Sequence, residues 1–250
     1  FENAAIRKSD LIICSTKAHA NLVAKESGIN LSSIKIIPLG IPMPGEDEIT
    51  FAENKNPTVL FVGRIEKRKG PHILAKAIPI VIRHIPDAEF IFIGRDTFVS
   101  ENNISINGDN KHSFKKMILE TIPEIYLNNV SFLGYVDTKK LSDYFRICDI
   151  FVAPSLYESF GLVYIEAMSY GKPVIGCGVG GVPEVIVDGV TGILVPPEDH
   201  KALAHSIIEL LKNKQKRKEM GRRGRIQVEN KFNGNMMVKH TEDAYFKVLN

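Results

Sequence analysis

The feature that most constrains this chain is the alternation of short apolar segments with helical segments that begins after residue 57. About six β-favouring segments recur, at residues 58–62, 89–93, 130–133, 150–153, 173–177 and 193–195. Short apolar strands that alternate with helices are typical of a parallel sheet with both faces covered. The sequence therefore predicts an α/β fold, a doubly wound Rossmann-like parallel sheet, in which ligands bind beyond the carboxyl ends of the strands.

The segments between and after these strands predict helices. Their expected ranges are 71–85, 114–122, 138–147, 160–170, 183–187, 200–212, 214–231 and 235–249. Pro71 would lie in the first turn of its helix, where proline is favoured. Residues 95–112 predict a long polar loop, and such loops in compact domains are often functional or disordered.

Residues 1–57 follow a different pattern. Apolar segments at 11–14 and 34–39 predict strands, and residues 17–27 predict a helix that ends at Gly28. Residues 41–57 show no periodicity, and their prolines, glycine and acidic residues predict a linker. The N-terminus lacks the features of a signal peptide and reads like the middle of a protein.

Composition narrows the functional class. The formal net charge of +3 comes from 32 basic and 29 acidic residues, which is too balanced for a protein that binds nucleic acid. Cys14, Cys148 and Cys177 lie in or beside apolar segments at wide spacing, so we expect buried thiols rather than disulfides or metal ligands. No segment approaches the roughly 18 apolar residues of a membrane span. These features predict a cytoplasmic protein in a reducing compartment.

A run of basic residues between 212 and 225 has two interpretations. It could contact anionic lipids at the inner face of a membrane, which would make the protein a peripheral one. A solvated helix face is favoured, because Glu209 and Glu219 interrupt the run.

The first candidate site follows the strand at 58–62. Gly63 allows a sharp turn, and Arg64 and Lys69 place two cations before the helix that begins at Pro71. The N-terminus of that helix adds N–H groups and the positive end of its dipole. We interpret this segment as an anion site, with a solvated basic loop as the alternative. The residue order of a Walker A loop is absent.

The second candidate site follows the strand at 150–153. Glu158 would lie in the loop and Glu166 in the first two turns of the next helix, with Gly161 between them. Carboxylates repel phosphate but accept hydrogen bonds from hydroxyls. A nucleotide sugar suits this arrangement, because it offers sugar hydroxyls, a diphosphate and a ribose diol in that order. The alternative is a local cap or pair for Glu166 and a simple loop charge for Glu158.

A third segment, residues 176–184, is rich in glycine and lies between a strand and a helix. It lacks the Gly-x-Gly-x-x-Gly spacing of a dinucleotide-binding loop. We interpret it as a tight turn that lets the backbone approach a ligand or a partner domain, with Glu184 in a structural role. The missing fingerprint also disfavours a nicotinamide-dependent dehydrogenase.

Taken in order, these motifs resemble the family-4 retaining glycosyltransferases, or glycosyl transferases group 1, which have the GT-B fold. The resemblance runs from about Asp10 to Tyr245. It is carried by Gly63-Arg64 with Lys69-Gly70, by Glu158-Ser159-Phe160-Gly161-Leu162 with Glu166, and by Gly180-Gly181 with Pro183-Glu184. Seven residues separate Glu158 from Glu166, as in the Glu-x7-Glu pattern of the family.

The resemblance implies catalytic roles for three side chains. Arg64 and Lys69 would bind the diphosphate of the donor, with Gly63 at the turn before them. Glu158 would contact hydroxyls of the transferred sugar. No cofactor or metal is implied, because the chain has no Asp-x-Asp motif and no tight His/Cys cluster.

The resemblance also implies contacts from the main chain. The backbone N–H groups of Phe160, Gly161 and Leu162 would serve sugar and phosphate. Glu166 would hold the ribose, and the main chain of Val136 would meet the base. The donor would be a UDP- or GDP-linked hexose.

Finally, the resemblance implies that half of the enzyme lies outside this chain. Residues 1–40 would be the tail of an N-terminal acceptor-binding domain, 41–57 the linker, 58–231 the nucleotide-sugar-binding domain and 232–250 a helix that crosses back. The family's catalytic His belongs to the missing part, so none is assigned. Two functions stay open. The first is retaining transfer of a hexose to an unknown acceptor hydroxyl, in the synthesis of a polysaccharide, glycolipid or related glycoconjugate. The alternative is that the isolated fragment binds the nucleotide-sugar donor without transferring the sugar.

Overall fold

The computed structural model describes residues 2–49, 56–99, 104–105 and 113–249. Its largest unit is a six-stranded sheet in which every neighbouring pair of strands is parallel. In spatial order the strands are β10 (Gly192–Val195), β9 (Val174–Cys177), β8 (Ile150–Ala153), β3 (Thr58–Val62), β4 (Glu89–Ile93) and β7 (Val130–Gly134). The predicted doubly wound α/β fold is confirmed, with all six expected strands in one sheet.

The strand order places a crossing point between β3 and β8. The chain runs outward from β3 through β4 to β7, and then returns to β8 and runs outward through β9 to β10. In open α/β sheets, ligands bind at such a point, beyond the carboxyl ends of the strands. The loops after β3 and β8 lie together there, and Leu156 N–H donates to Arg68 O at 2.8 Å.

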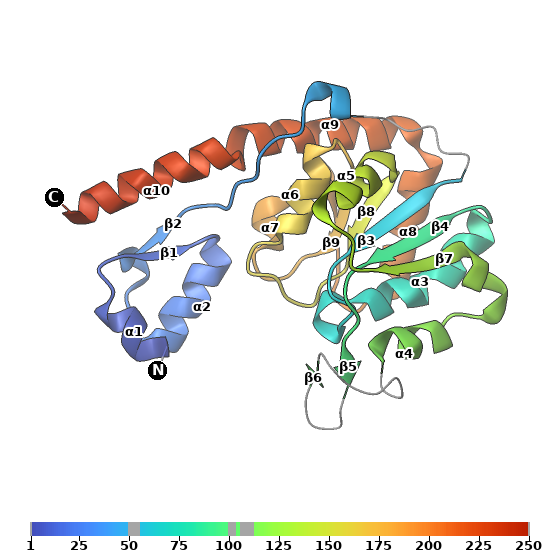
Figure 1. Ribbon diagram of the computed structural model, residues 1–250, viewed down its shortest axis with the longest axis horizontal. Coiled ribbons are helices and arrows are strands. Elements are labelled where there is room, and N and C mark those ends of the chain that lie inside the picture. The colour runs from blue at the N-terminus through green and yellow to red at the C-terminus, as the bar shows by residue number, and fades with distance from the viewer. Residues whose placement is uncertain (1, 50–55, 100–103, 106–112, 250) are drawn as a thin grey trace.

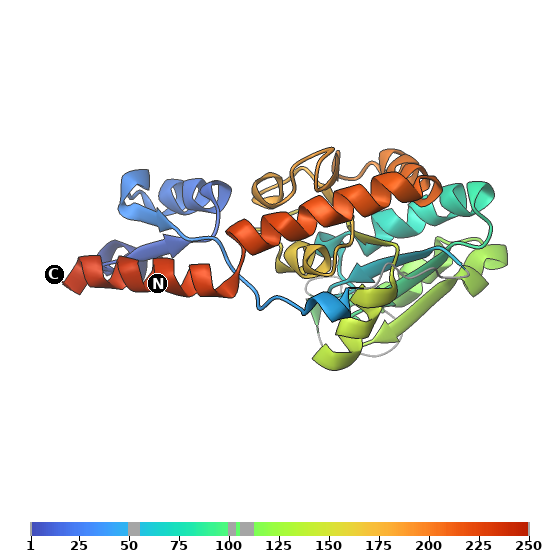
Figure 2. The ribbon, with the colours of Figure 1, turned by 90° about the horizontal axis from the view of Figure 1, so that it is seen from above.

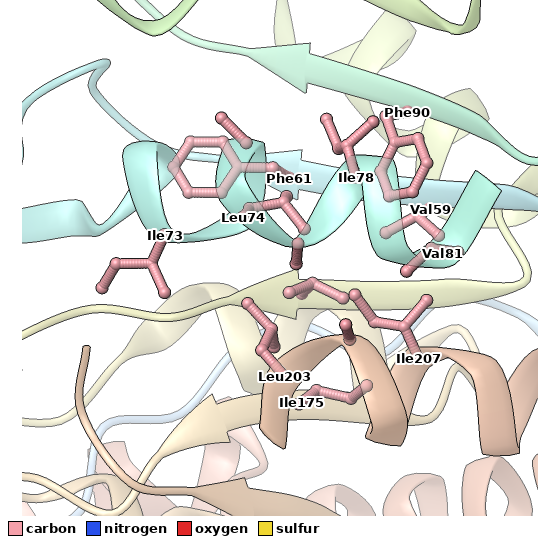
Figure 3. Packing of buried hydrophobic residues seen from close by; sticks show 14 of the residues in the cluster. Val59, Phe61, Ile73, Leu74, Ile78, Val81, Phe90, Ile175, Leu203 and Ile207 are labelled. Carbon is pink, nitrogen blue, oxygen red and sulfur yellow. The ribbon is translucent and has the colours of Figure 1, made fainter. Parts of the chain in front are cut away.

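Alternation along the strands produces a core on each face of the sheet. Val59 and Phe61 of β3 belong to one core, whereas Leu60 belongs to the other. The first core packs under α3 (Pro71–His84) and α8 (His200–Lys212), whose side chains interleave as Figure 3 shows. Burial of each such side chain contributes about 1.5–3 kcal/mol, so the two cores hold the sheet and its edge loops in place.

The remaining helices complete the two layers. α4 lies with α3 and α8, and the opposite core is covered by α5, α6, α7 and α9. Their bounds are α4 (Phe114–Glu120), α5 (Thr138–Ile147), α6 (Leu162–Ser169), α7 (Val182–Val185) and α9 (Lys214–Lys231).

A smaller lobe lies apart from the large sheet (Figures 1 and 2). It contains α1 (Glu2–Lys8), the parallel strands β1 (Ile12–Cys14) and β2 (Ile34–Ile36), and α2 (Lys17–Ser27). The lobe has a small apolar core of its own. The long helix α10 (Gly234–Leu249) follows α9 and leads back along this lobe.

The linker and the junction between α9 and α10 cross in backbone contact. Ile41 N–H donates to Phe232 O, and Gly234 N–H donates to Ile41 O, both at 2.9 Å. A Cβ on Gly40 would lie 2.5 Å from Asn233 O. The two connections between the lobes are therefore bound to each other.

Most predicted helices and strands agree with the structure to within two residues. The predicted helices 138–147, 200–212 and 214–231 have the observed bounds. The helix predicted from residue 160 begins at Leu162, because Gly161 has a left-handed φ of 92°. Helix α1 was not predicted.

Two predicted irregular segments are described only in part. Within the predicted loop 95–112, β5 (Phe98–Val99) pairs antiparallel with β6 (Ile104–Ser105). The rest of that loop, from 100 to 103 and from 106 to 112, lies outside the described residues, as do residues 50–55 of the predicted linker. The predicted domain boundaries stay predictions.

Gly221 lets α9 approach the turn after α6. A Cβ at Gly221 would lie 1.9 Å from Gly171 O, so the backbone would have to move. Although alanine normally favours a helix by about 1 kcal/mol over glycine, we expect Gly221→Ala to lower the free energy of unfolding by about 1–3 kcal/mol. Gly178→Ala, with nothing within 4 Å of its Cβ, is the control and should change it by less than about 0.5 kcal/mol. Urea unfolding measures both, and equal midpoints for the two variants would contradict the packing argument.

Candidate active site

A cleft of about 350 Å³ opens at the crossing point between β3 and β8. Its walls come from the end of β3, the loop after β8, the first turns of α6 and Leu39 of the segment before the linker. Seven of the nine residues predicted for the donor site line it: Gly63, Lys69, Glu158, Phe160, Gly161, Leu162 and Glu166. Arg64 and Val136 are not among the lining residues. The structure thus brings together two segments that the sequence identified separately.

An ion pair joins the two loops inside the cleft. Lys69 Nζ lies 2.5 Å from Glu158 Oε1, across 89 positions of sequence. Ser155 Oγ donates to the same oxygen at 3.0 Å. Glu158 is only 7% exposed, and a carboxylate so buried is costly unless it is paired and hydrogen-bonded. Lys69 and Ser155 therefore fix the position of Glu158, a pairing that the sequence analysis did not predict.

A second carboxylate organises the arginines of the loop after β3. Glu66 is 4% exposed, and its Oε1 lies 3.2 Å from the guanidinium of Arg64 and 3.1 Å from that of Arg68. Arg68 also lies 4.0 Å from Glu158 Oε2. Arg64 follows Gly63 directly, but its guanidinium is directed to Glu66 and is 55% exposed. The charge-rich run 64–69 was the only sequence signal for Glu66 and Arg68, and it did not single them out.

Two glycines beside the cleft have left-handed backbone and no room for a side chain. Gly70 has a φ of 74°, and a Cβ there would lie 1.9 Å from Pro154 O. Gly161 has a φ of 92°, and a Cβ there would lie 2.6 Å from the ring of Tyr164. The Tyr164 hydroxyl donates to Ala153 O at 2.5 Å, which holds that ring in the core. A side chain at Gly70 would push the two loops apart, and one at Gly161 would displace the ring of Tyr164.

Backbone donors lie at the same cleft. In the part of the chain that the structure describes, the N–H groups of Phe160 and Gly161 donate to no protein oxygen. Leu162 opens α6, and the first N–H groups of a helix have no partner within it. The positive end of the helix dipole adds to their effect. These groups can therefore hold an anion or a hydroxyl oxygen.

Glu166 lies where the cleft meets a second cavity of about 260 Å³, which α5 and the linker also line. Burial raises the pKa of Glu166 above its ordinary value. Among the described residues, no cation forms an ion pair with its carboxylate. A partly buried acid with a perturbed pKa in a cleft is typical of a ligand-binding position.

The glycine-rich segment supports the Glu158 loop from outside the cleft. Gly181 N–H donates to Glu158 O at 2.8 Å, and a Cβ on Gly181 would lie 2.2 Å from Ser159 O. Glu184 accepts hydrogen bonds from two N–H groups at the start of α2. The backbone approaches the Glu158 loop of the same domain rather than a ligand, and the contacts of Glu184 agree with the structural role expected for it.

This fold and this cleft define a doubly wound α/β domain with a cleft lined by charged groups at its crossing point. Residues 45–227 match the family of glycosyl transferases group 1. The chain belongs to this family, and the resemblance identified from its motifs is confirmed.

Individual proteins and solved structures are similar to this chain over most of its length. Spore coat protein SA of Bacillus subtilis (strain 168) is 34% identical over 191 residues, which cover 76% of this chain and 48% of that protein. The structure of Anabaena HepE with UDP and glucose has a TM-score of 0.82 at 24% identity, covering 97% of this chain and 64% of that one. The C-terminal domain of a glycosyl transferase group 1 family protein (LpcC) from Francisella tularensis has a TM-score of 0.64 at 26% identity, covering 78% and 99%. The large sheet is therefore the C-terminal type of GT-B domain.

The chain spans about half the length of the curated relatives it matches. Among the described residues, no helix combines the length and the apolar character that crossing a bilayer requires.

Glu166→Gln tests the energetic cost of the partly buried carboxylate. Because the native pKa of Glu166 is raised, the native state binds more protons than the unfolded chain between the ordinary and the raised pKa. Its contribution to stability therefore falls as the pH rises through that window, and the loss persists at neutral pH. We expect the variant to raise the thermal unfolding midpoint of the ligand-free protein at neutral pH, with a difference that shrinks toward pH ~4.

The matched control is Glu124→Gln, which changes an exposed glutamate in a short 3-10 turn. It should leave the midpoint unchanged at both pH values. A variant at Glu166 that is less stable than the wild type at neutral pH would show that the carboxylate has a stabilising partner.

Proposed function

We propose that the whole protein transfers a hexose, with retention of configuration, from a UDP- or GDP-linked sugar to an acceptor hydroxyl in the synthesis of a polysaccharide, glycolipid or related glycoconjugate. The observation that carries this proposal is that Lys69, Glu158 and Glu166 line one cleft at the crossing point of the sheet. A lysine suits a diphosphate, and carboxylates suit hydroxyl groups. A nucleoside diphosphate sugar presents both in one molecule.

Arg64 and Lys69 would bind the diphosphate. When the bond between sugar and diphosphate breaks, negative charge grows on the leaving oxygens, and fixed cations stabilise it. The N–H groups of Phe160, Gly161 and Leu162 would add donors whose direction is set by the backbone. The guanidinium of Arg64 is more than half exposed, so it has room to turn from Glu66 toward a bound phosphate.

The two carboxylates would recognise the neutral parts of the donor. Glu158 would accept hydrogen bonds from hydroxyls of the transferred sugar, beside the phosphate held by Lys69. Glu166 would accept those of the ribose diol, and its place between two cavities suits a ribose that lies between diphosphate and base. The main chain of Val136, which precedes the N-terminus of α5, would meet the base.

The comparisons support this proposal. The matched family region, residues 45–227, contains all nine proposed donor residues. The Anabaena structure that shares this fold holds UDP and glucose.

Substitution of the two cations tests the diphosphate site. We expect Arg64→Met and Lys69→Met each to weaken the binding of UDP-glucose or GDP-mannose about ten- to a hundredfold, because a charge-assisted hydrogen bond contributes about 1.5–3 kcal/mol. Isothermal titration calorimetry measures the affinity. Lys67→Met is the control, since Lys67 is exposed on the same short turn and does not line the cleft. Wild-type affinity in both Arg64→Met and Lys69→Met would refute the assigned role.

The alternative function is donor binding without transfer by this chain alone. Two observations favour it. The chain spans about half the length of its curated relatives, and the described sheet of the smaller lobe has two strands. We expect the 250-residue chain to bind the nucleotide sugar but to release no glycosylated product, whereas the full-length gene product transfers the sugar. A transfer assay with radiolabelled donor compares the two, and turnover by the shorter chain would contradict the alternative.

The basic run 212–225 is a weak candidate for membrane contact. Glu219 pairs with Arg222 at 3.0 Å and with Arg223 at 2.6 Å, and Arg225 pairs with Glu229 at 3.0 Å. Hydrogen bonds from the two arginines lower the pKa of Glu219 to about 2. This internal pairing supports a solvated helix face.

A further inference from the structure

The side chain of Thr16, in the smaller lobe, reaches the Glu158 loop. Thr16 Oγ1 donates to Ser159 O at 2.7 Å, across 143 positions of sequence. Thr16 is 1% exposed, and its hydroxyl oxygen also caps α2 by accepting from His19 N–H at 3.1 Å. The Thr16 hydroxyl therefore donates a hydrogen bond to the large domain and accepts one within its own lobe.

The neighbouring contacts hold Thr16 in this position. Glu184 of α7 accepts from the N–H groups of Lys17 and Ala18, each at 2.8 Å. A carboxylate at the N-terminus of a helix is also favoured by the helix dipole. A Cβ on Gly181 would lie 2.7 Å from Thr16 Cγ2, so the methyl group of Thr16 is seated against bare backbone.

The hydrogen bond to Ser159 O has a consequence on the other side of the same peptide group. In a trans peptide the C=O and N–H bonds point in opposite directions, and no cis bond occurs in the described residues. Fixing Ser159 O toward Thr16 therefore fixes Phe160 N–H in the opposite direction. A hydrogen bond to the carbonyl also polarises the peptide, which makes its N–H a stronger donor.

Two consecutive peptide groups of this loop are oriented by different parts of the molecule. Gly181 N–H donates to Glu158 O at 2.8 Å, and both residues belong to the large domain. Thr16 orients the following peptide, and it belongs to the smaller lobe. Of these two peptide groups, the second, which carries the Phe160 N–H, is the one whose direction depends on the position of the smaller lobe.

We propose that Thr16 is a positioning residue for the nucleotide sugar, acting through Ser159 on the N–H group of Phe160, a residue that lines the cleft. This inference rests on the proposed function, because it takes the phosphate and sugar of a nucleotide sugar as the partner of that N–H. Docking of the smaller lobe sets the direction of the Phe160 N–H bond, so Thr16 contributes to the affinity for the nucleotide sugar without touching it.

Thr16→Val tests the proposal, since valine nearly conserves the volume but has no hydroxyl. Calorimetric titrations with UDP-glucose should show a loss of affinity of about three- to tenfold, as expected for one net hydrogen bond. Binding of uridine, which has neither diphosphate nor hexose, should not change. Thr16→Ser keeps the hydroxyl and should restore the affinity for UDP-glucose. If the wild type prefers guanine, GDP-mannose and guanosine replace the two ligands.

Ser27→Ala is the matched control. Ser27 is fully buried in the same helix, and its hydroxyl donates to Val23 O at 2.6 Å within that helix. This variant disturbs α2 without touching the Glu158 loop, so its affinity for UDP-glucose should equal that of the wild type.

The outcomes separate this inference from the function on which it rests. Wild-type affinity in Thr16→Val, together with a loss in Lys69→Met, would overturn the role of Thr16 and leave donor binding intact. An equal loss for UDP-glucose and uridine would indicate a general disturbance and would also overturn it. Failure of the wild type to bind either nucleotide sugar would refute the proposed function itself.

Discussion

The pairing of β3 with β8 is the constraint on which the rest of this structure depends. These strands are distant in sequence, yet their parallel register brings their carboxyl ends to one edge of the sheet. The loops that follow must then share that edge, and Gly70 meets Pro154 O where no side chain would fit. Every proposed donor residue except Val136 lies in one of these two loops or in the helix that follows the second.

The large sheet could be predicted from the sequence because burial on both faces leaves a simple signature. Strands such as Thr58–Val62 must be apolar at nearly every position, and the helices between them carry one apolar face. Short elements with little burial carry no such signature, which is why α1 and the β5–β6 pairing were not predicted. The start of α6 was misplaced by two residues because the left-handed Gly161 ends the loop.

The site was predicted in its residues but not in its contacts. Spacing identified Lys69 and Glu158 as ligand-binding groups, but their ion pair depends on tertiary register across 89 positions of sequence. The contact of Thr16 with Ser159 depends on the placement of a separate lobe. Within the run 64–69, charge alone could not indicate that Glu66 would hold both Arg64 and Arg68. Motifs name the groups, whereas the packing of two loops decides which of them touch.

Because Lys69 and Glu158 pair with each other in the cleft, a ligand that binds either group must replace an existing contact between charges. A free phosphate would be attracted by the lysine but repelled by the carboxylate. A free sugar would donate hydrogen bonds to the carboxylate but would leave the lysine without an anionic partner. A molecule that carries an anion and hydroxyls side by side compensates both groups at once. The pair would therefore favour a ligand that links an anion to hydroxyl groups over an anion or a hydroxyl compound alone.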